Sequence, residues 1–479
     1  MSGKKKQDTL ISIPFKSFIE VTVLLVALLA VSVALTYIIP RGEFGTLQDG
    51  QPDYLQYIRR DDLGGIPPLK GIFAPVLVFF SKDGPALIVL SVFLLVISAV
   101  FQIMNDGGGI KVLVEAVSSK FRTRRRLLLI MIAFLFYCFG SFLGLFEEML
   151  TMLPIVASLC ICLGYDSFTG FICSILACGF GFAGAITNPF TVLLASQIIG
   201  ADITEHIWFR LLIFAVMFLL LLGFLFFYLR KLEKDPRSSL TLAHDGVLRQ
   251  NEDAAEAGGQ SSTGNRSRLL TGYMIFLPGA LVLIIVASLL PFLRDYTVVI
   301  MILYFLIFGL LTGTVTSGSF KKTFRSFLKG IAGTLPSIVF IAVAASIKYV
   351  FEQGAILPTI INQVNIYISG RSAVSLALII YLAVLFLEFF ISSSTAKAIL
   401  VMGFLSMLNT GLTKQMLVLL YTLGDGYTNV LFPTSPVLLI SLSMIGVKYS
   451  AWTRKSAPLF AFNFLLVIAF IILGVLLKY

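Results

Sequence analysis

Long runs of apolar residues dominate this chain of 479 residues. A helix needs roughly 20 apolar residues to cross the hydrocarbon core of a bilayer. Runs of about that length or longer occur at 18–39, 85–105, 167–198, 207–229, 272–292, 297–316, 331–351, 414–446 and 456–478. Only 13% of the residues are charged, against about 25% in soluble domains. The sequence therefore predicts an all-α polytopic membrane protein in contact with the lipid bilayer.

Two further apolar stretches, 127–163 and 373–410, are each too long for a single crossing. The centre of the first reads GSFLGLFEE, and that of the second reads LEFFISSSTAK. Polar groups and turns at membrane depth are tolerated where protein or water, rather than lipid, surrounds them. We therefore expect two re-entrant helical hairpins that each enter and leave on the same side.

Two of the predicted spans contain residues that break helices. The span 167–198 contains GFAGAITNPFTV, and the span 414–446 contains LGDGYTNVLFPTSPVL. Proline removes a backbone donor and clashes with the preceding turn, so both helices should be interrupted at mid-membrane. The freed N–H and C=O groups at such breaks form sites for ions and polar substrates.

Basic residues beside apolar segments predict the orientation, because cytoplasmic loops carry an excess of Lys and Arg. Clusters occur at 4–6, 120–126, 230–234, 321–329 and 454–455. Placing these clusters in the cytoplasm puts the N-terminus inside and Tyr479 outside. We expect a first inverted repeat at 1–230, a cytoplasmic flexible linker at 231–269, and a connecting helix plus a second inverted repeat at 270–479.

The two halves share a spacing of polar residues. Thr187 follows Glu147 by 40 positions, and Thr428 follows Glu388 by the same interval (187 − 147 and 428 − 388). An Asn follows each of the two threonines. The extra crossing at 272–292 makes the second half start on the opposite side. An inverted-topology repeat of this kind is the usual plan of a secondary transporter.

Ionisable and polar residues at the predicted hairpin tips and breaks are the candidates for binding a substrate or ion, because such groups are costly inside a membrane. They are Glu147, Glu148, Thr187, Asn188, Glu388, Ser392, Ser393, Ser394, Thr395, Asp425, Thr428, Asn429, Thr434 and Ser435. Four of them are carboxylates, and Lys397 is the one basic residue nearby. This excess favours a cationic substrate such as a basic amino acid, or coupling to protons or sodium at the broken helices.

Other classes of protein fit the sequence less well. The five cysteines lie in apolar runs and the two histidines have no zinc-type spacing, so we expect no metal site and no cofactor. The net charge of +11 comes largely from residues that flank apolar segments, which does not indicate nucleic-acid binding. A channel would need a continuous polar stripe. SSST with Lys397 could form a Ser-Lys dyad, but no oxyanion loop accompanies it, so we expect no enzyme.

Several motifs together resemble a known family. They are YIIPRGEF, GLFEE, GYDSFTG, GFAGAITNPFTV, ISSSTAKA and LGDGYTNVLFPTSPVL. These segments resemble the YfcC family of proposed basic amino acid antiporters, which is grouped with the C4-dicarboxylate anaerobic carriers. The resemblance implies the ion transporter superfamily fold with elevator-type motion, a homodimer and a bacterial cytoplasmic (inner) membrane location. It also leaves a C4-dicarboxylate as the alternative substrate.

Overall fold

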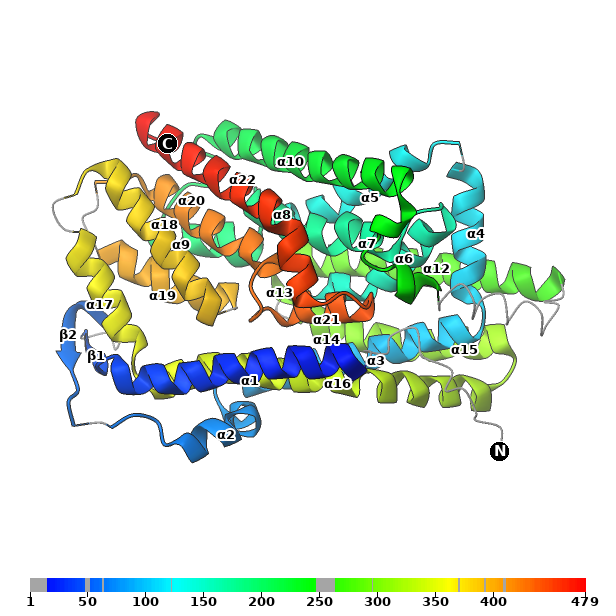
Figure 1. Ribbon diagram of the computed structural model, residues 1–479, viewed down its shortest axis with the longest axis horizontal. Coiled ribbons are helices and arrows are strands. Elements are labelled where there is room, and N and C mark those ends of the chain that lie inside the picture. Colours follow the sequence, from blue (N-terminus) through cyan, green and yellow to red (C-terminus); the bar gives the residue numbers. More distant parts are fainter. Residues whose placement is uncertain are drawn as a thin grey trace.

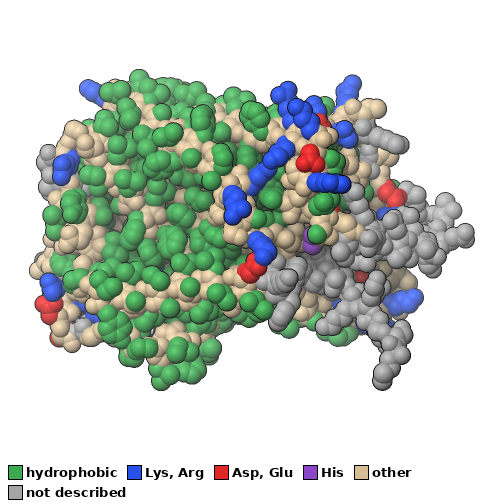
Figure 2. Space-filling model, in the orientation of Figure 1, with side chains coloured by type: hydrophobic (Ala, Val, Ile, Leu, Met, Phe, Trp, Pro, Cys, Tyr) green, Lys and Arg blue, Asp and Glu red, His purple; other side chains and the backbone are tan. Residues whose placement is uncertain are grey.

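The computed structural model describes residues 15–47, 52–62, 64–121, 123–246, 263–294, 296–368, 371–391, 393–407 and 411–479. Within these ranges, eight helices are long and apolar enough to cross a membrane. Helices make up almost all of the fold (Figure 1), so the predicted polytopic helical protein is confirmed. Figure 2 shows hydrophobic side chains over most of one face, with Lys and Arg gathered mainly toward its two ends.

A small sheet is the exception to the all-helical prediction. Strands β1 (Gly42–Thr46) and β2 (Pro52–Arg59) pair in antiparallel fashion in the loop after the first span. The N–H of Gly42 donates to the carbonyl of Ala355, 3.0 Å away, which ties the sheet to the loop after α16 (Phe320–Gln353). The hairpin therefore covers one end of the molecule rather than crossing the membrane.

One bundle of helices lies along the lower edge of Figure 1, where α1 and α16 run side by side. Its main members are α1 (Phe15–Ile38), α3 (Gly84–Asp106), α12 (Thr263–Leu289), α14 (Thr297–Tyr304), η7 (Phe305–Gly309), α15 (Leu310–Ser317) and α16 (Phe320–Gln353). Helices α3 and α16 approach very closely, since a Cβ on Gly330 would lie 2.5 Å from the Cα of Ala99. Glycine at this position permits the close packing.

Short elements join the helices of this bundle to one another or to the rest of the chain. They are α2 (Pro68–Leu77), η1 (Val78–Phe80), α4 (Gly109–Phe121), α13 (Pro291–Arg294) and α17 (Leu357–Ile368). Helix α4 packs on α6 (Leu153–Cys162) of the first hairpin, and α17 packs on α18 (Ala373–Phe390) of the second. Each hairpin is thus reached through a short helix that follows a long helix of the first bundle.

The predicted hairpins are both present. The first consists of α5 (Arg125–Cys138), η2 (Phe139–Leu143), η3 (Glu148–Thr151) and α6 (Leu153–Cys162). The second consists of α18 (Ala373–Phe390) and α19 (Ser394–Met407). The first tip turns at Gly144, whose φ of +68° belongs to the left-handed region that glycine adopts without strain.

The predicted broken helices are present as well. The first runs through α7 (Ser167–Phe171), η4 (Ile172–Leu176) and α8 (Ala177–Ala183), then resumes as η5 (Pro189–Leu193) and α9 (Leu194–Ile199). The second runs through α20 (Lys414–Asp425) and η8 (Tyr427–Val430), then resumes as α21 (Pro436–Met444). Together with the hairpins, α10 (Ile207–Lys234) and α22 (Tyr449–Leu476), they form a second bundle.

The two hairpins open toward opposite ends of the molecule. Arg125 donates to the carbonyl of Leu163 at 3.4 Å, which places both ends of the first hairpin together. That end carries the start of α1, and the second hairpin opens at the end where the chain finishes (Figure 1). The order of long helix, short helix, hairpin, broken helix and long helix therefore repeats with inverted direction, as the sequence predicts.

The segment predicted as a flexible linker, 231–269, is partly folded. Helix α10 continues to Lys234, η6 covers Pro236–Ser238, and α12 already begins at Thr263. Residues 247–262 lie outside the described residues. The prediction of a flexible linker is therefore wrong for 235–246. The sequence also predicts the ends of α10 and α12 incorrectly, because the polar residues there show no helical pattern of apolar residues.

The segment 235–246 is docked on the start of the first broken helix. The buried Asp245 accepts hydrogen bonds from the N–H of Ser167, at 3.0 Å, and from the hydroxyl of the same residue. Asp166, also buried, accepts from the Ser239 hydroxyl at 2.6 Å. These bonds satisfy donors at a helix N-terminus that would otherwise lack partners.

The arrangement of the ends leads to a labelling prediction. Arg237→Cys and Lys478→Cys place single thiols on exposed positions at opposite ends of the molecule. In a background with the five native cysteines replaced, an impermeant thiol reagent should label Lys478→Cys in intact cells. It should label Arg237→Cys only after the membrane is opened, since basic loops stay in the cytoplasm. Labelling of both from one side would contradict the inverted arrangement.

Candidate functional site

The first break is held together by hydrogen bonds from the first hairpin. Asn188 caps η5 by accepting from the N–H groups of Phe190, at 2.9 Å, and Thr191, at 3.2 Å. Its side-chain amide donates to the carbonyl of Gly140 at 3.0 Å. The Ser141 hydroxyl donates to the carbonyl of Gly184 at 2.8 Å. Backbone groups freed by the break therefore find partners inside the protein, as an apolar environment requires.

The second break uses its polar side chains differently. The amide of Asn429 donates to the carbonyls of Asp425 and Gly426, at 2.9 and 3.2 Å. The Thr428 hydroxyl bonds the Asp425 carbonyl at 3.0 Å. The buried Ser435 takes the capping position of the helix that follows, accepting from the N–H of Leu438 at 3.4 Å.

The equal spacing in the sequence thus does not mean equal roles. Asn188 caps the helix after its break, whereas Asn429 binds carbonyls of the helix before its break. Ser435 is the structural counterpart of Asn188. The segments differ in length by a few residues, so a constant offset aligns the amino acids but not the turns in which they lie.

A buried ionic triad joins the second hairpin to the second broken helix. The Lys397 ammonium on α19 contacts the Glu388 carboxylate on α18 and lies 2.6 Å from Oδ1 of Asp425, at the end of α20. The side chains of Lys397 and Asp425 have no exposed area, and that of Glu388 is 2% exposed. Lys397, the one basic residue that the sequence places near these carboxylates, thus pairs with both Glu388 and Asp425.

Polar groups of the second hairpin surround this triad. The Ser394 hydroxyl donates to Oδ2 of Asp425 at 2.9 Å, and the Tyr421 hydroxyl donates to the Ser394 carbonyl. Ser393 and Thr395 are exposed at the tip, and Ser392 lies outside the described residues. The structure therefore brings Glu388, Ser394 and Asp425 together.

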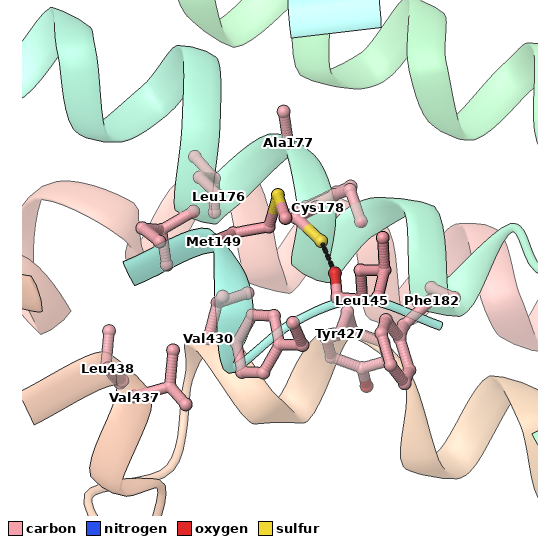
Figure 3. Close-up of a cluster of buried hydrophobic side chains, with 14 of the residues drawn as sticks. Leu145, Met149, Leu176, Ala177, Cys178, Phe182, Tyr427, Val430, Val437 and Leu438 are labelled. Atoms are coloured by element: carbon pink, nitrogen blue, oxygen red, sulfur yellow. Dashed lines mark hydrogen bonds between the residues drawn. The ribbon is translucent and has the colours of Figure 1, made fainter. Parts of the chain in front are cut away.

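The first hairpin tip packs on both broken helices rather than on the triad. Figure 3 shows Leu145 and Met149 among Cys178, Tyr427 and Val437, with the Cys178 thiol donating to the Leu145 carbonyl at 2.5 Å.

The two acidic residues on this tip differ in their exposure to solvent. Glu147 is exposed and Glu148 is buried. Within the described part of the chain, neither carboxylate forms an ion pair. The remaining candidates lie within the two breaks: Thr187 is half-buried and Thr434 is buried.

The two broken helices touch through their backbones. A Cβ on Gly426 would lie 2.3 Å from the Cα of Ala183, and one on Gly179 would lie 2.5 Å from the Val430 side chain. Only glycine fits at either contact. The carbonyl-rich end of each first half-helix is thereby held against the other at the centre of the second bundle.

Three polar residues were not among the predicted site residues. Arg210, buried on α10, donates to the carbonyl of Ala185 in the first break at 3.4 Å. Asn463 on α22 is fully buried, and both polar atoms of its side chain lack a hydrogen-bond partner among the described residues. The Thr191 hydroxyl on η5 is buried without a partner in the same sense. A lone Asn or Arg inside an apolar run is the signal that could have identified the first two.

A cavity elsewhere in the structure does not compete with this region. It measures about 490 Å³ and lies between α12 and α14, lined by residues such as Val282, Leu283 and Ile307. Its walls are apolar apart from Tyr304, and it lies in the other bundle, so it is a poor site for an ion.

Comparison with known proteins gives three findings. The family model for the C4-dicarboxylate anaerobic carrier matches residues 18–476. A protein of Escherichia coli named "Putative basic amino acid antiporter YfcC" is 26% identical over 441 residues, covering 88% of this chain and 84% of that protein. An uncharacterised protein of Haemophilus influenzae is 26% identical over 375 residues, covering 77% of this chain and 72% of its own length.

One solved structure is also similar. It is the YdaH transporter of Alcanivorax borkumensis, which is 18% identical and aligns with a TM-score of 0.43 over 95% of this chain and 99% of that one.

The contacts of Asn188 give a stability prediction. Asn188→Ala loses both capping bonds and the bond to Gly140, so it should destabilise the purified protein by about 1–3 kcal/mol. Asn188→Ser keeps a neutral oxygen that can cap η5 and loses the bond to Gly140, so it should lie between wild type and the alanine variant. Thermal unfolding in detergent measures both.

A matched control removes a cap far from the breaks. Ser319 caps α16 in the first bundle through a longer bond of 3.5 Å to the N–H of Lys322. Ser319→Ala should therefore lower the melting temperature less than Asn188→Ala. An equal effect of the two substitutions would show that the first break gains no special support from Asn188.

Proposed function

Because the chain belongs to the C4-dicarboxylate anaerobic carrier family, we propose that it moves a small charged metabolite, namely a basic amino acid, by secondary active transport. It is a multi-pass membrane transporter. The finer assignment of substrate is our proposal. It covers arginine- or ornithine-type exchange as well as ion-coupled uptake of the same substrates.

The buried triad is the observation that carries this proposal. Two carboxylates, Glu388 and Asp425, face a single ammonium from Lys397 without contact with water. A buried charge without a partner is costly, so an excess of negative charge calls for a cation. A basic amino acid supplies that cation, and its α-carboxylate can bind at the N-terminus of a half-helix in place of the side-chain cap that Asn188 or Ser435 supplies there.

The relatives agree with a carrier but differ in the substrate that their names give. The family description speaks of C4-dicarboxylates, whereas the name of the Escherichia coli protein speaks of basic amino acids. The family description names a carrier and the Escherichia coli protein is named an antiporter, whereas the Haemophilus influenzae protein is uncharacterised.

A dicarboxylate is the alternative substrate, and the family description favours it. Lys397 is then the cation that would receive one of its carboxylates. Glu388 and Asp425 would have to move away or take up protons, because two carboxylates already share the ammonium. The excess of carboxylates is why we place this alternative second.

Several features of the working protein belong to the same proposal. We assign it to the bacterial cytoplasmic membrane, with the N-terminus and residues 235–246 in the cytoplasm and the C-terminus outside. Coupling to protons or sodium at the broken helices needs no cofactor. A homodimer and elevator-type motion rest on the resemblance of its motifs to the YfcC family.

Removing one carboxylate should separate the two substrates. Asp425→Asn keeps the shape of the side chain and removes its charge, so uptake of labelled arginine into proteoliposomes should fall strongly. Protons and the cation both neutralise the same carboxylates, so acid pH should weaken arginine uptake by wild type more than by the variant. Uptake of succinate by both proteins, with none of arginine by either, would refute the basic amino acid and select the dicarboxylate.

A further inference from the structure

The triad of Glu388, Lys397 and Asp425 carries a net charge of −1 when all three groups are ionised. We propose that this triad selects substrates by their net charge, and that Lys397 sets the selected value at +1. The inference rests on the proposed function, because it assumes that the substrate reaches this triad. It adds a reason why a basic amino acid, rather than a neutral one or a diamine, would be chosen.

The burial of the triad makes charge balance the deciding quantity. All three side chains are 2% exposed or less, so water screens their interactions very little. Arginine and ornithine each carry two positive groups and one carboxylate, for a net +1. Adding either one brings the total charge to zero, whereas a neutral amino acid leaves −1 and a dication leaves +1.

The groups that pack around the triad do not alter this count. Hydroxyls face it, from Ser394 and Tyr421, and a Tyr381–Tyr427 hydroxyl pair bonds at 2.8 Å between α18 and η8. Helix α9 and η5, which pack on α19, contain no Asp, Glu, Lys, Arg or His.

The helices packed on α18 do carry charges, away from the triad. The charged residues of α22 are Arg454 and Lys455, which lie near the start of that helix, at the end away from the triad. The charged residues in the last turns of α16 are Lys348 and Glu352, and they pair with each other. Glu147 and Glu148 form no ion pair with the triad, as described above.

A second observation places polar chemistry beside the triad. The unpartnered hydroxyl of Thr191 is fully buried on η5, which packs on both α19 and α20. Buried polar groups are nearly always hydrogen-bonded, so one without a partner indicates a place for a polar ligand. The triad thus adjoins a segment that can bind the uncharged parts of a substrate.

Substitutions can move the net charge in single steps. Glu388→Gln keeps the shape and gives 0, whereas Lys397→Met gives −2. The double variant with both substitutions returns the total to −1, with Asp425 as the remaining charge. Glu147 and Glu148 are unchanged in all of these variants, so they do not contribute to the differences in net charge between them.

Three ligands have closely related structures and differ in net charge. Arginine is +1, citrulline replaces the guanidinium by a neutral group and is 0, and agmatine lacks the carboxylate and is +2. Binding to the full-length protein in detergent is measured by titration calorimetry. Comparing variants for the same ligand cancels the effect of the missing agmatine carboxylate.

The proposal predicts that the preferred ligand changes with the net charge of the triad. Wild type should bind arginine best. Glu388→Gln should shift the ratio of citrulline to arginine affinity by at least about tenfold toward citrulline. Lys397→Met should shift the ratio of agmatine to arginine affinity by a similar factor toward agmatine. The double variant should restore the preference for arginine, which a purely structural role of Lys397 does not predict.

A matched control is available in the first bundle. Lys348 also contacts two carboxylates, Asp83 at 2.5 Å and Glu352 at 3.3 Å, with 12% of its side chain exposed. Lys348→Met should leave the order of the three ligands as in wild type. A changed order there would overturn the assignment of selection to Lys397.

The outcomes separate this inference from the proposed function. If wild type binds arginine and every variant keeps its ligand order, charge selection by the triad is refuted while the transporter assignment stands. If wild type binds none of the three ligands but binds succinate, the basic amino acid is refuted as the substrate, and the premise of charge selection by the triad is refuted with it. Should Lys397→Met fail to fold, Glu388→Gln and the double variant still decide, because they predict opposite preferences.

Discussion

Every backbone group released inside a membrane must find a partner within the protein, and the second bundle is arranged around that requirement. The two breaks free carbonyls and N–H groups at Gly184–Asn188 and Gly426–Ser435. Ser141 of the first hairpin supplies one partner, and Asn188 and Asn429 supply others from the breaks themselves. The first hairpin packs against its broken helix because lipid could not satisfy these groups.

The ionic triad adds a second constraint to the first. Hydrogen bonds stabilise the breaks whatever the ligand, whereas under our proposal the buried excess of one carboxylate distinguishes ligands by charge. The family description and the name of the Escherichia coli relative point to substrates of opposite sign. A region with two carboxylates and one ammonium could change its preference through very few substitutions, which agrees with different substrates within one family.

The lengths of apolar runs and the positions of Gly and Pro were enough to predict the spans, both hairpins and both breaks. Those features depend on local sequence and on the thickness of a bilayer. The sequence did not predict that Asn188 and Asn429 act on opposite sides of their breaks, or that Asp245 docks on Ser167. These contacts depend on where separate helices meet, so no spacing along the chain contains them. The roles of the site residues in binding remain predictions.

The contact between Gly426 and Ala183 has a mechanical consequence. With no side chain between the two backbones, neither broken helix can slide or tilt at this point without carrying the other. The two broken helices, although they belong to separate halves of the chain, are therefore coupled in any movement of the second bundle. A bulkier residue at 426 would push the two helices apart and weaken this coupling.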